Sequence, residues 1–214
     1  MGSVRPPAAS SLSPRARSAR RAVAAAAVLA LAAGVAACSA DPATEAYLSG
    51  TNQGYISGDF RVEEIPQEER GEPVEWAGVT EDGDELTSDD TAGDVVVVNF
   101  WYAACGPCRV EAADLESVWQ EYEDDSVSFV GVNTYDQADT AKSFAKQYEI
   151  TYPSVIDVND GSVKLAFAGA TPIQATPTTL VLDAEGRVAA RIIGQLEGAS
   201  ILSTLVADAL AETP

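Results

Sequence analysis

Two long apolar runs predict the central strands of this chain. Residues 95–101 are apolar except for Asn99, and residues 127–133 repeat the pattern with short interruptions. Runs of this kind are typical of strands buried on both faces of a sheet. A third run, residues 178–183, is followed by an Ala-Glu-Gly turn and a return segment over residues 187–194. This pattern predicts an antiparallel hairpin late in the chain.

Apolar positions spaced three and four residues apart predict helices between and after these strands. The first helix includes Cys108 and continues through Leu115, and Pro107 is tolerated in its first turn because the amide there has no helical partner. Residues 138–148 and 201–210 also place their apolar side chains on one face. Each of these segments therefore predicts a helix that packs on a sheet.

Shorter segments complete the predicted fold. Residues 74–80 and 85–87 surround an acidic turn and predict a β-hairpin. A short strand is expected at residues 155–157 and a short helix at residues 163–167. Alternating strands and helices predict an α/β domain over residues 72–214, with a mixed central β-sheet flanked by helices on both faces and an N-terminal β-hairpin extension.

The N-terminal residues 1–37 have the pattern of an export signal. Four arginines cluster within residues 15–21, directly before residues 22–33, an apolar stretch too short to span a bilayer as a helix. The sequence Val-Ala-Ala before Cys38 resembles the bacterial lipobox, in which the cysteine is acylated and becomes the new N-terminus. An ordinary signal peptide with an incidental cysteine is the alternative. Residues 38–71 are polar and acidic, and we expect them to form a flexible tether.

The chain is strongly acidic, with 33 Asp and Glu against 13 Lys and Arg and a net charge of −20. Removal of residues 1–37 takes away five arginines and no acid, which leaves a net charge of −25. Such a surface repels nucleic acid and anionic headgroups and favours basic partners. Because the acids are spread along the whole chain, we prefer solubility as the explanation.

A Cys-Gly-Pro-Cys sequence lies where the first long strand passes into the first helix. Cys105 and Cys108 are the only cysteines besides Cys38, and a CxxC pair is either half of a metal site or a redox pair. The sequence has no histidine, and its only methionine is Met1, so a copper site would need oxygen or another thiol as a further ligand. A helix N-terminus favours a thiolate at Cys105, which indicates redox chemistry.

Five motifs in this order resemble the TlpA/ResA-like branch of the thioredoxin superfamily. The resemblance covers about residues 72–210 and implies a thioredoxin fold. The motifs are Asn99-Phe100-Trp101, Cys105-Gly106-Pro107-Cys108-Arg109, Glu111, Thr176-Pro177-Thr178-Thr179 and Asp183-Ala184-Glu185-Gly186.

The resemblance implies a catalytic role for three of these residues. Cys105 would attack a substrate disulfide and Cys108 would resolve the mixed disulfide, so the pair would cycle through a Cys105–Cys108 disulfide. Glu111 would tune the ionisation of the thiols, because Asn99 occupies the place where thioredoxin itself has a buried acid. From helix geometry alone, Glu111 is equally well explained as a solvated carboxylate.

The resemblance also implies a substrate-binding loop. The Thr176-Pro177 peptide would be cis, and the backbone of Thr176 would pair with the main chain of the substrate. Trp101 would lie beside the active site, where it either contacts substrate or belongs to the core. Ala104 departs from the family, whose members commonly carry a tryptophan immediately before the first cysteine. Partner choice therefore need not follow the family.

The implied function is that of a lipid-anchored thiol-disulfide oxidoreductase at the outer face of the cell membrane. The Gly-Pro spacer, shared with thioredoxin, favours reduction of disulfides in exported proteins. Apocytochrome c, in cytochrome c biogenesis, is one candidate substrate, and a membrane thiol carrier is the expected electron donor. We expect a monomer with no cofactor, no metal and no nucleic-acid partner. A disulfide-forming oxidase, a copper-binding chaperone and a thiol peroxidase are the alternatives.

Overall fold

The structure is a computed structural model that describes residues 62–212. The predicted export signal, Cys38 and most of the predicted tether lie outside the described residues. Over residues 62–212, none of the helices combines the length and the apolar character needed to cross a membrane.

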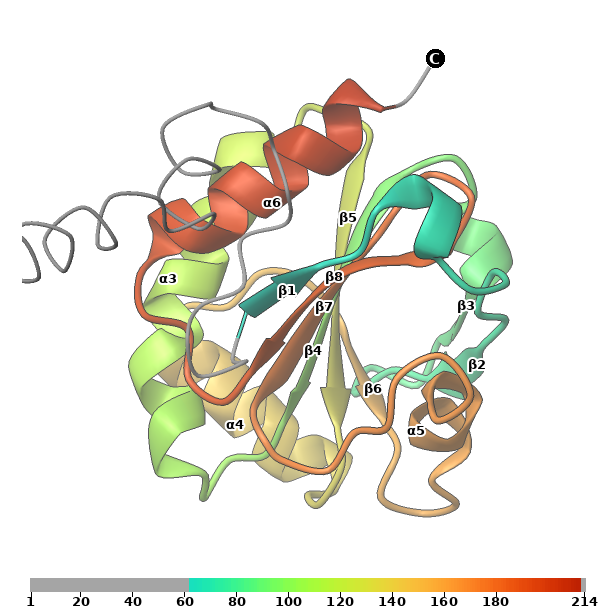
Figure 1. Cartoon of the computed structure of the whole chain (residues 1–214). Helices are drawn as coiled ribbons and strands as arrows, with labels where there is room; N and C mark the ends of the chain where they lie inside the picture. The colour runs from blue at the N-terminus through green and yellow to red at the C-terminus, as the bar shows by residue number, and fades with distance from the viewer. Residues whose placement is uncertain (1–61, 213–214) are drawn as a thin grey trace, which may run out of the picture. The chain divides into compact units, whose positions relative to one another are not determined.

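A six-stranded mixed sheet forms the centre of the described region, with strand order β1-β8-β7-β4-β5-β6 (Figure 1). β4, β5 and β6 run parallel to one another. On the other side of β4, each of β7, β8 and β1 is antiparallel to the preceding strand. The strands are β1 (Val62–Glu64), β4 (Val95–Trp101), β5 (Val127–Asn133), β6 (Ser154–Ile156), β7 (Thr178–Leu182) and β8 (Val188–Ile193).

Strand β4 is central to the packing because all of its residues are buried. Its side chains alternate between two cores, as the strand period requires. Val95 and Val97 belong to one apolar cluster, whereas Val96 and Val98 belong to the other. The apolar run in the sequence therefore reflects burial on both faces, and the predicted α/β fold is confirmed.

Helices cover both faces of the sheet (Figure 1). α3 (Gly106–Tyr122) and α6 (Ala199–Ala211) pack over one face, and α4 (Ala138–Tyr148) lies beside α3 on the same side. α5 (Ser162–Phe167) packs against the other face. α3, α4 and α6 correspond to the segments whose apolar spacing predicted them, and α5 corresponds to the short helix expected at residues 163–167.

The predicted N-terminal hairpin is present as β2 (Ala77–Val79) and β3 (Glu85–Thr87), followed by the 3₁₀ turn η2 (Ser88–Thr91). An isolated antiparallel bridge joins Thr80, directly after β2, to Val155 in β6. The hairpin therefore lies beside the outer edge of the main sheet and shares the apolar cluster of α5.

The predicted tether extends too far into the folded domain. Inside residues 38–71 the structure places strand β1, which pairs with β8, and the 3₁₀ turn η1 (Gln67–Glu69). Val62 is buried on the sheet, but one buried residue in a three-residue strand leaves no detectable period in the sequence. The folded region therefore includes residues 62–71, before the predicted boundary at residue 72.

Candidate active site

The two cysteines follow strand β4 and lie at the end of the sheet where the parallel strands finish. Cys105 is the N-cap of α3, and Pro107 lies in the first turn of that helix. The connecting loop is fixed on both sides: Arg109 Nε donates a hydrogen bond to the Ala103 carbonyl at 2.7 Å, and the Ala103 amide donates to Asp136 Oδ2 at 2.6 Å. The cysteines are thus held on a rigid strand-to-helix junction.

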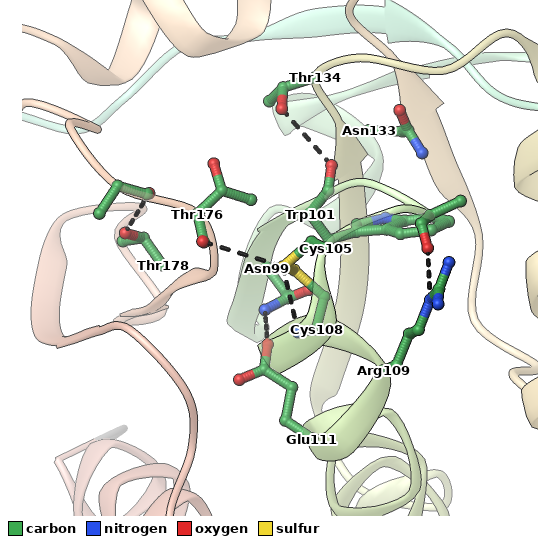
Figure 2. The surroundings of a disulfide bond; sticks show 12 residues. Asn99, Trp101, Cys105, Cys108, Arg109, Glu111, Asn133, Thr134, Thr176 and Thr178 are labelled. Carbon is green, nitrogen blue, oxygen red and sulfur yellow. Dashed lines mark hydrogen bonds between the residues drawn. A yellow bond between two sulfur atoms is a disulfide. The ribbon is translucent and has the colours of Figure 1, made fainter.

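Cys105 and Cys108 form a disulfide with an S–S distance of 2.03 Å (Figure 2). The Cys108 amide donates a hydrogen bond to Cys105 Sγ at 3.1 Å. This amide is one of the unpaired donors of the helix N-terminus, and it would stabilise negative charge on Cys105 Sγ after reduction.

The two sulfurs have different surroundings, although Cys105 is only 3% exposed and Cys108 2%. Cys105 Sγ lies 3.8 Å from the Thr176 carbonyl oxygen. Cys108 instead lines an internal cavity of about 10 Å³ together with Asn99 and Trp101. Such a volume has room for about one water molecule. Cys105 therefore faces the predicted substrate loop, and Cys108 faces the interior.

Glu111 is completely buried, so the alternative of a solvated helix carboxylate is wrong. Its carboxylate accepts hydrogen bonds from Asn99 Nδ2 at 3.0 Å and from the Leu196 amide at 2.8 Å. Burial raises the pKa of Glu111 to about 7, against the lowering effect of these two hydrogen bonds. The group therefore changes charge near neutral pH, one helical turn after Cys108.

The Thr176-Pro177 peptide is cis, as expected. Pro177 lies directly before β7, and its carbonyl accepts a hydrogen bond from the Gly194 amide at 2.8 Å. Thr178 Oγ1 donates to the Ala175 carbonyl at 2.9 Å, which closes the loop. The loop is therefore anchored at its base, with the Thr176 carbonyl facing Cys105 (Figure 2).

Trp101 lies in the same apolar cluster as both cysteines, beside the disulfide as expected. Its indole is 6% exposed, packs on Phe144 and donates a hydrogen bond to Ser154 Oγ at 3.2 Å. A Cβ at Gly131 would approach Ser154 Oγ to 2.2 Å, so only glycine fits beside this hydrogen bond. The burial favours a packing role for Trp101 and leaves little surface for substrate.

Several residues that organise the site did not stand out in the sequence. Thr179 accepts the second hydrogen bond of Asn99, and Asn133 and Asp136 fix the loop beside Cys105. Asn99 interrupts an apolar strand and Asn133 ends one, and a polar residue in a buried run signals a hydrogen-bonding partner. Asp136 carries no such signal because it lies in a polar stretch of the sequence. Ser154 opens a strand of only three residues, which is too short to show an interrupted apolar run.

The described residues show no grouping of three or more Cys, His, Asp or Glu side chains that would hold a metal ion. The cavity beside Cys108 is lined mainly by apolar groups, which do not ligate metals. What the site offers chemically is a disulfide at a helix N-terminus, a buried carboxyl group and a cis-proline loop.

These features on this mixed sheet define the class of thioredoxin-fold thiol-disulfide oxidoreductases. The sequence model of the Redoxin family matches residues 64–206, and the chain belongs to that family. A thiol-disulfide oxidoreductase ResA of Bacillus cereus (strain ATCC 10987 / NRS 248) is 29% identical over 145 residues, which cover 67% of this chain and 77% of the relative. A ResA of Bacillus anthracis is 31% identical over 123 residues, 55% of this chain and 68% of the relative.

A solved structure gives the same result. The crystal structure of a DsbF homologue from Corynebacterium diphtheriae superposes with a TM-score of 0.61 at 30% sequence identity, and the match covers 74% of this chain and 99% of that one. The TlpA/ResA-like resemblance and the thioredoxin fold are thereby confirmed, and the chain is a thiol-disulfide oxidoreductase.

Proposed function

We propose that this oxidoreductase is exported and reduces disulfides of exported proteins, with Cys105 as the attacking thiol and Cys108 as the resolving thiol. The observation that carries the proposal is the unequal environment of the two sulfurs. Cys105 Sγ accepts the amide hydrogen bond at the helix N-terminus, whereas Cys108 faces the internal cavity. Only Cys105 combines a stabilised thiolate with a position next to the Thr176 loop.

In the first step, the thiolate of reduced Cys105 attacks one sulfur of the substrate disulfide. A bond forms between Cys105 Sγ and that sulfur, the substrate S–S bond breaks, and the other substrate sulfur leaves as a thiolate. The Thr176 carbonyl, 3.8 Å from Cys105 Sγ, is placed to accept a backbone N–H of an extended substrate segment. This hydrogen bond would hold the substrate in line for attack.

In the second step, Cys108 loses its proton and attacks Cys105 Sγ. The Cys105–Cys108 bond forms and the substrate leaves as a second thiolate, so two electrons have passed from the protein to the substrate. Glu111, whose pKa is raised to about 7 by burial, is the residue to which we assign the Cys108 proton. The cavity lined by Cys108 and Asn99 has room for a water between these two residues, and Asn99 in turn donates a hydrogen bond to the Glu111 carboxylate.

An external dithiol must then return two electrons to the protein. We assign this task to a membrane thiol carrier, and the two or three acyl chains expected on a lipoprotein, attached at Cys38, would keep the domain at the outer face of the membrane beside it. The Gly-Pro spacer, which thioredoxin also has, supports the reducing direction. Apocytochrome c awaiting haem is the candidate substrate for this direction.

Trapping the mixed disulfide tests the assignment of the two thiols. In Cys108→Ser, the second step cannot occur, so exported proteins should accumulate in covalent complexes that dithiothreitol releases. Cys105→Ser should form no complexes, since the attacking sulfur is absent. Complexes formed by Cys105→Ser but not by Cys108→Ser would reverse the assignment, and an empty trap in both variants would remove the proposed function.

The direction of electron flow is tested by the reduction potential of the pair. Equilibration of the purified domain with glutathione and dithiothreitol buffers should give a value near that of thioredoxin, about −270 mV. A value above about −200 mV, beyond the range of glutaredoxins, would make disulfide formation the preferred direction.

A further inference from the structure

Beside the loop that leads to Cys105, the structure exposes an aromatic side chain that the proposed chemistry does not use. Tyr135 is 73% exposed, an unusual state for a large aromatic residue. Its ring packs on Tyr102, with the ring centroids 5.6 Å apart. Tyr102 is half-buried and lies three residues before Cys105. We call this pair the tyrosine rim.

Sheet topology places the tyrosine rim opposite the Thr176 loop. β4 and β5 are parallel, with Trp101 opposite Asn133. The residues that follow the two strands therefore lie side by side at the carboxyl ends of these strands. β7 lies on the other side of β4 and, being antiparallel to it, begins beside the carboxyl end of β4. Figure 2 shows Thr176 and Asn133 on opposite sides of the disulfide. A substrate segment held at Thr176 and extending across Cys105 therefore reaches the rim.

Hydrogen bonds hold the backbone of the rim in place, in addition to the packing of Tyr135 on Tyr102. Asn133 Oδ1 accepts from the amides of Tyr135 and Asp136, at 3.1 and 2.7 Å. Asp136 Oδ2 in turn accepts from the Ala103 amide at 2.6 Å and from Asn133 Nδ2 at 3.1 Å. The loop that carries Tyr135 is thus tied directly to the loop that carries Cys105, and ordering Tyr135 on binding should cost little entropy.

We propose that the tyrosine rim is a specificity-determining surface that binds an apolar side chain next to the attacked cysteine of an extended polypeptide substrate. This inference rests on the proposed function and names how its substrate is recognised. Tyr is one of the residues that contribute most at interfaces, because its rigid ring buries a large area at small entropic cost. Ala104 offers only a methyl group immediately before Cys105, so the aromatic contact comes from the neighbouring strand end instead.

The test compares three probes in a reduction assay: a disulfide-bridged peptide with leucine next to the cysteine, the same peptide with serine there, and 5,5′-dithiobis(2-nitrobenzoic acid). Tyr135→Ala should lower kcat/KM for the leucine peptide by about tenfold. The serine peptide and the small disulfide should change by less than about twofold. Tyr135→Phe should behave as wild type, because the ring and not the hydroxyl provides the contact.

Leu165→Ala serves as the matched control, since Leu165 is also 73% exposed but lies on α5. It should leave all three rates unchanged. The inference is overturned if Tyr135→Ala matches wild type on the leucine peptide, or if it slows all three probes equally. If the wild-type protein reduced none of the three probes, that result would contradict the proposed function and therefore also this inference.

Discussion

Two buried carboxyl groups, which lie at opposite ends of the central strands, have opposite electrostatic surroundings. Glu111, beside the disulfide, receives hydrogen bonds only from uncharged donors among its described partners, the Asn99 amide and the Leu196 backbone. Asp183, at the β7–β8 turn, forms ion pairs with Arg70 and Arg187, each at 2.9 Å. Both carboxyl groups are shielded from water, but only Asp183 has cationic partners.

The pKa values of the two groups follow from this difference. Burial alone raises the pKa of each. For Asp183, the Arg187 backbone hydrogen bond and the Arg70 and Arg187 guanidinium groups outweigh burial, and the net pKa is lowered. For Glu111, burial prevails and the pKa rises to about 7. A buried carboxyl group without a cation is thus able to exchange a proton near neutral pH, whereas one with cations serves stability.

The largest effect should come from Asp183→Asn, which breaks two ion pairs at once and leaves Arg70 with Glu212 and Arg187 with Glu185. We expect the free energy of unfolding to fall by about 4 kcal/mol, as for other broken buried ion pairs. Urea unfolding of the oxidised protein measures it. The lowered pKa means that the stabilisation by Asp183 is complete above its ordinary pKa of 3.8 and is lost as the pH falls further. The penalty should therefore be constant between pH 5 and 8.

The exposed neighbour of Asp183 provides the control. Glu185 also pairs with Arg187, but its side chain is 64% exposed, and Glu185→Gln should cost less than about 1 kcal/mol. If Asp183→Asn lowered the free energy of unfolding by no more than Glu185→Gln, the ion pairs of Asp183 would not be what stabilises the β7–β8 turn.

Glu111→Gln should have a smaller effect of the opposite sign, and one that depends on pH. Because the folded pKa of about 7 lies above the ordinary value of 4.5, the wild type loses stability as the pH rises between these two values. Relative to wild type, the variant should gain up to about 3 kcal/mol between pH 4 and pH 8. Unfolding of the oxidised proteins at both pH values measures the gain without cysteine titration. If the stability difference between Glu111→Gln and wild type did not change with pH, Glu111 would not be the group that exchanges a proton in this pH range.

Asn99→Ala should give the smallest effect, through the pKa of Glu111. Loss of the donor 3.0 Å from the carboxylate should raise that pKa by a further unit, about 1.4 kcal/mol. The midpoint of the pH-dependent stability change would move upward accordingly. Thr179→Val removes the other hydrogen bond of Asn99 and should shift the midpoint less. An unchanged midpoint in Asn99→Ala would show that Asn99 does not hold the carboxylate.

Patterns within single segments predicted most of the fold. The strand over residues 127–133 and the helix over residues 138–148 have the predicted bounds. Strand β1 was missed because three residues at a sheet edge contain too little of a period. The helix that begins at the CxxC turn extends beyond Leu115, the last position of its predicted apolar spacing, to Tyr122, because helix termini are set by a few local hydrogen bonds.

The sequence by itself determined the strand, the CxxC turn and the helix, because each depends on neighbours a few residues apart. It also identified the cis-proline loop through the family resemblance. Only the tertiary structure decided the chemistry of Glu111, whose two donors come from β4 and from Leu196, 85 residues away in the chain. The pairing of Tyr135 with Tyr102 likewise depends on the parallel register of β4 and β5. Burial and charge environment are set by contacts between distant segments, and no local pattern records them.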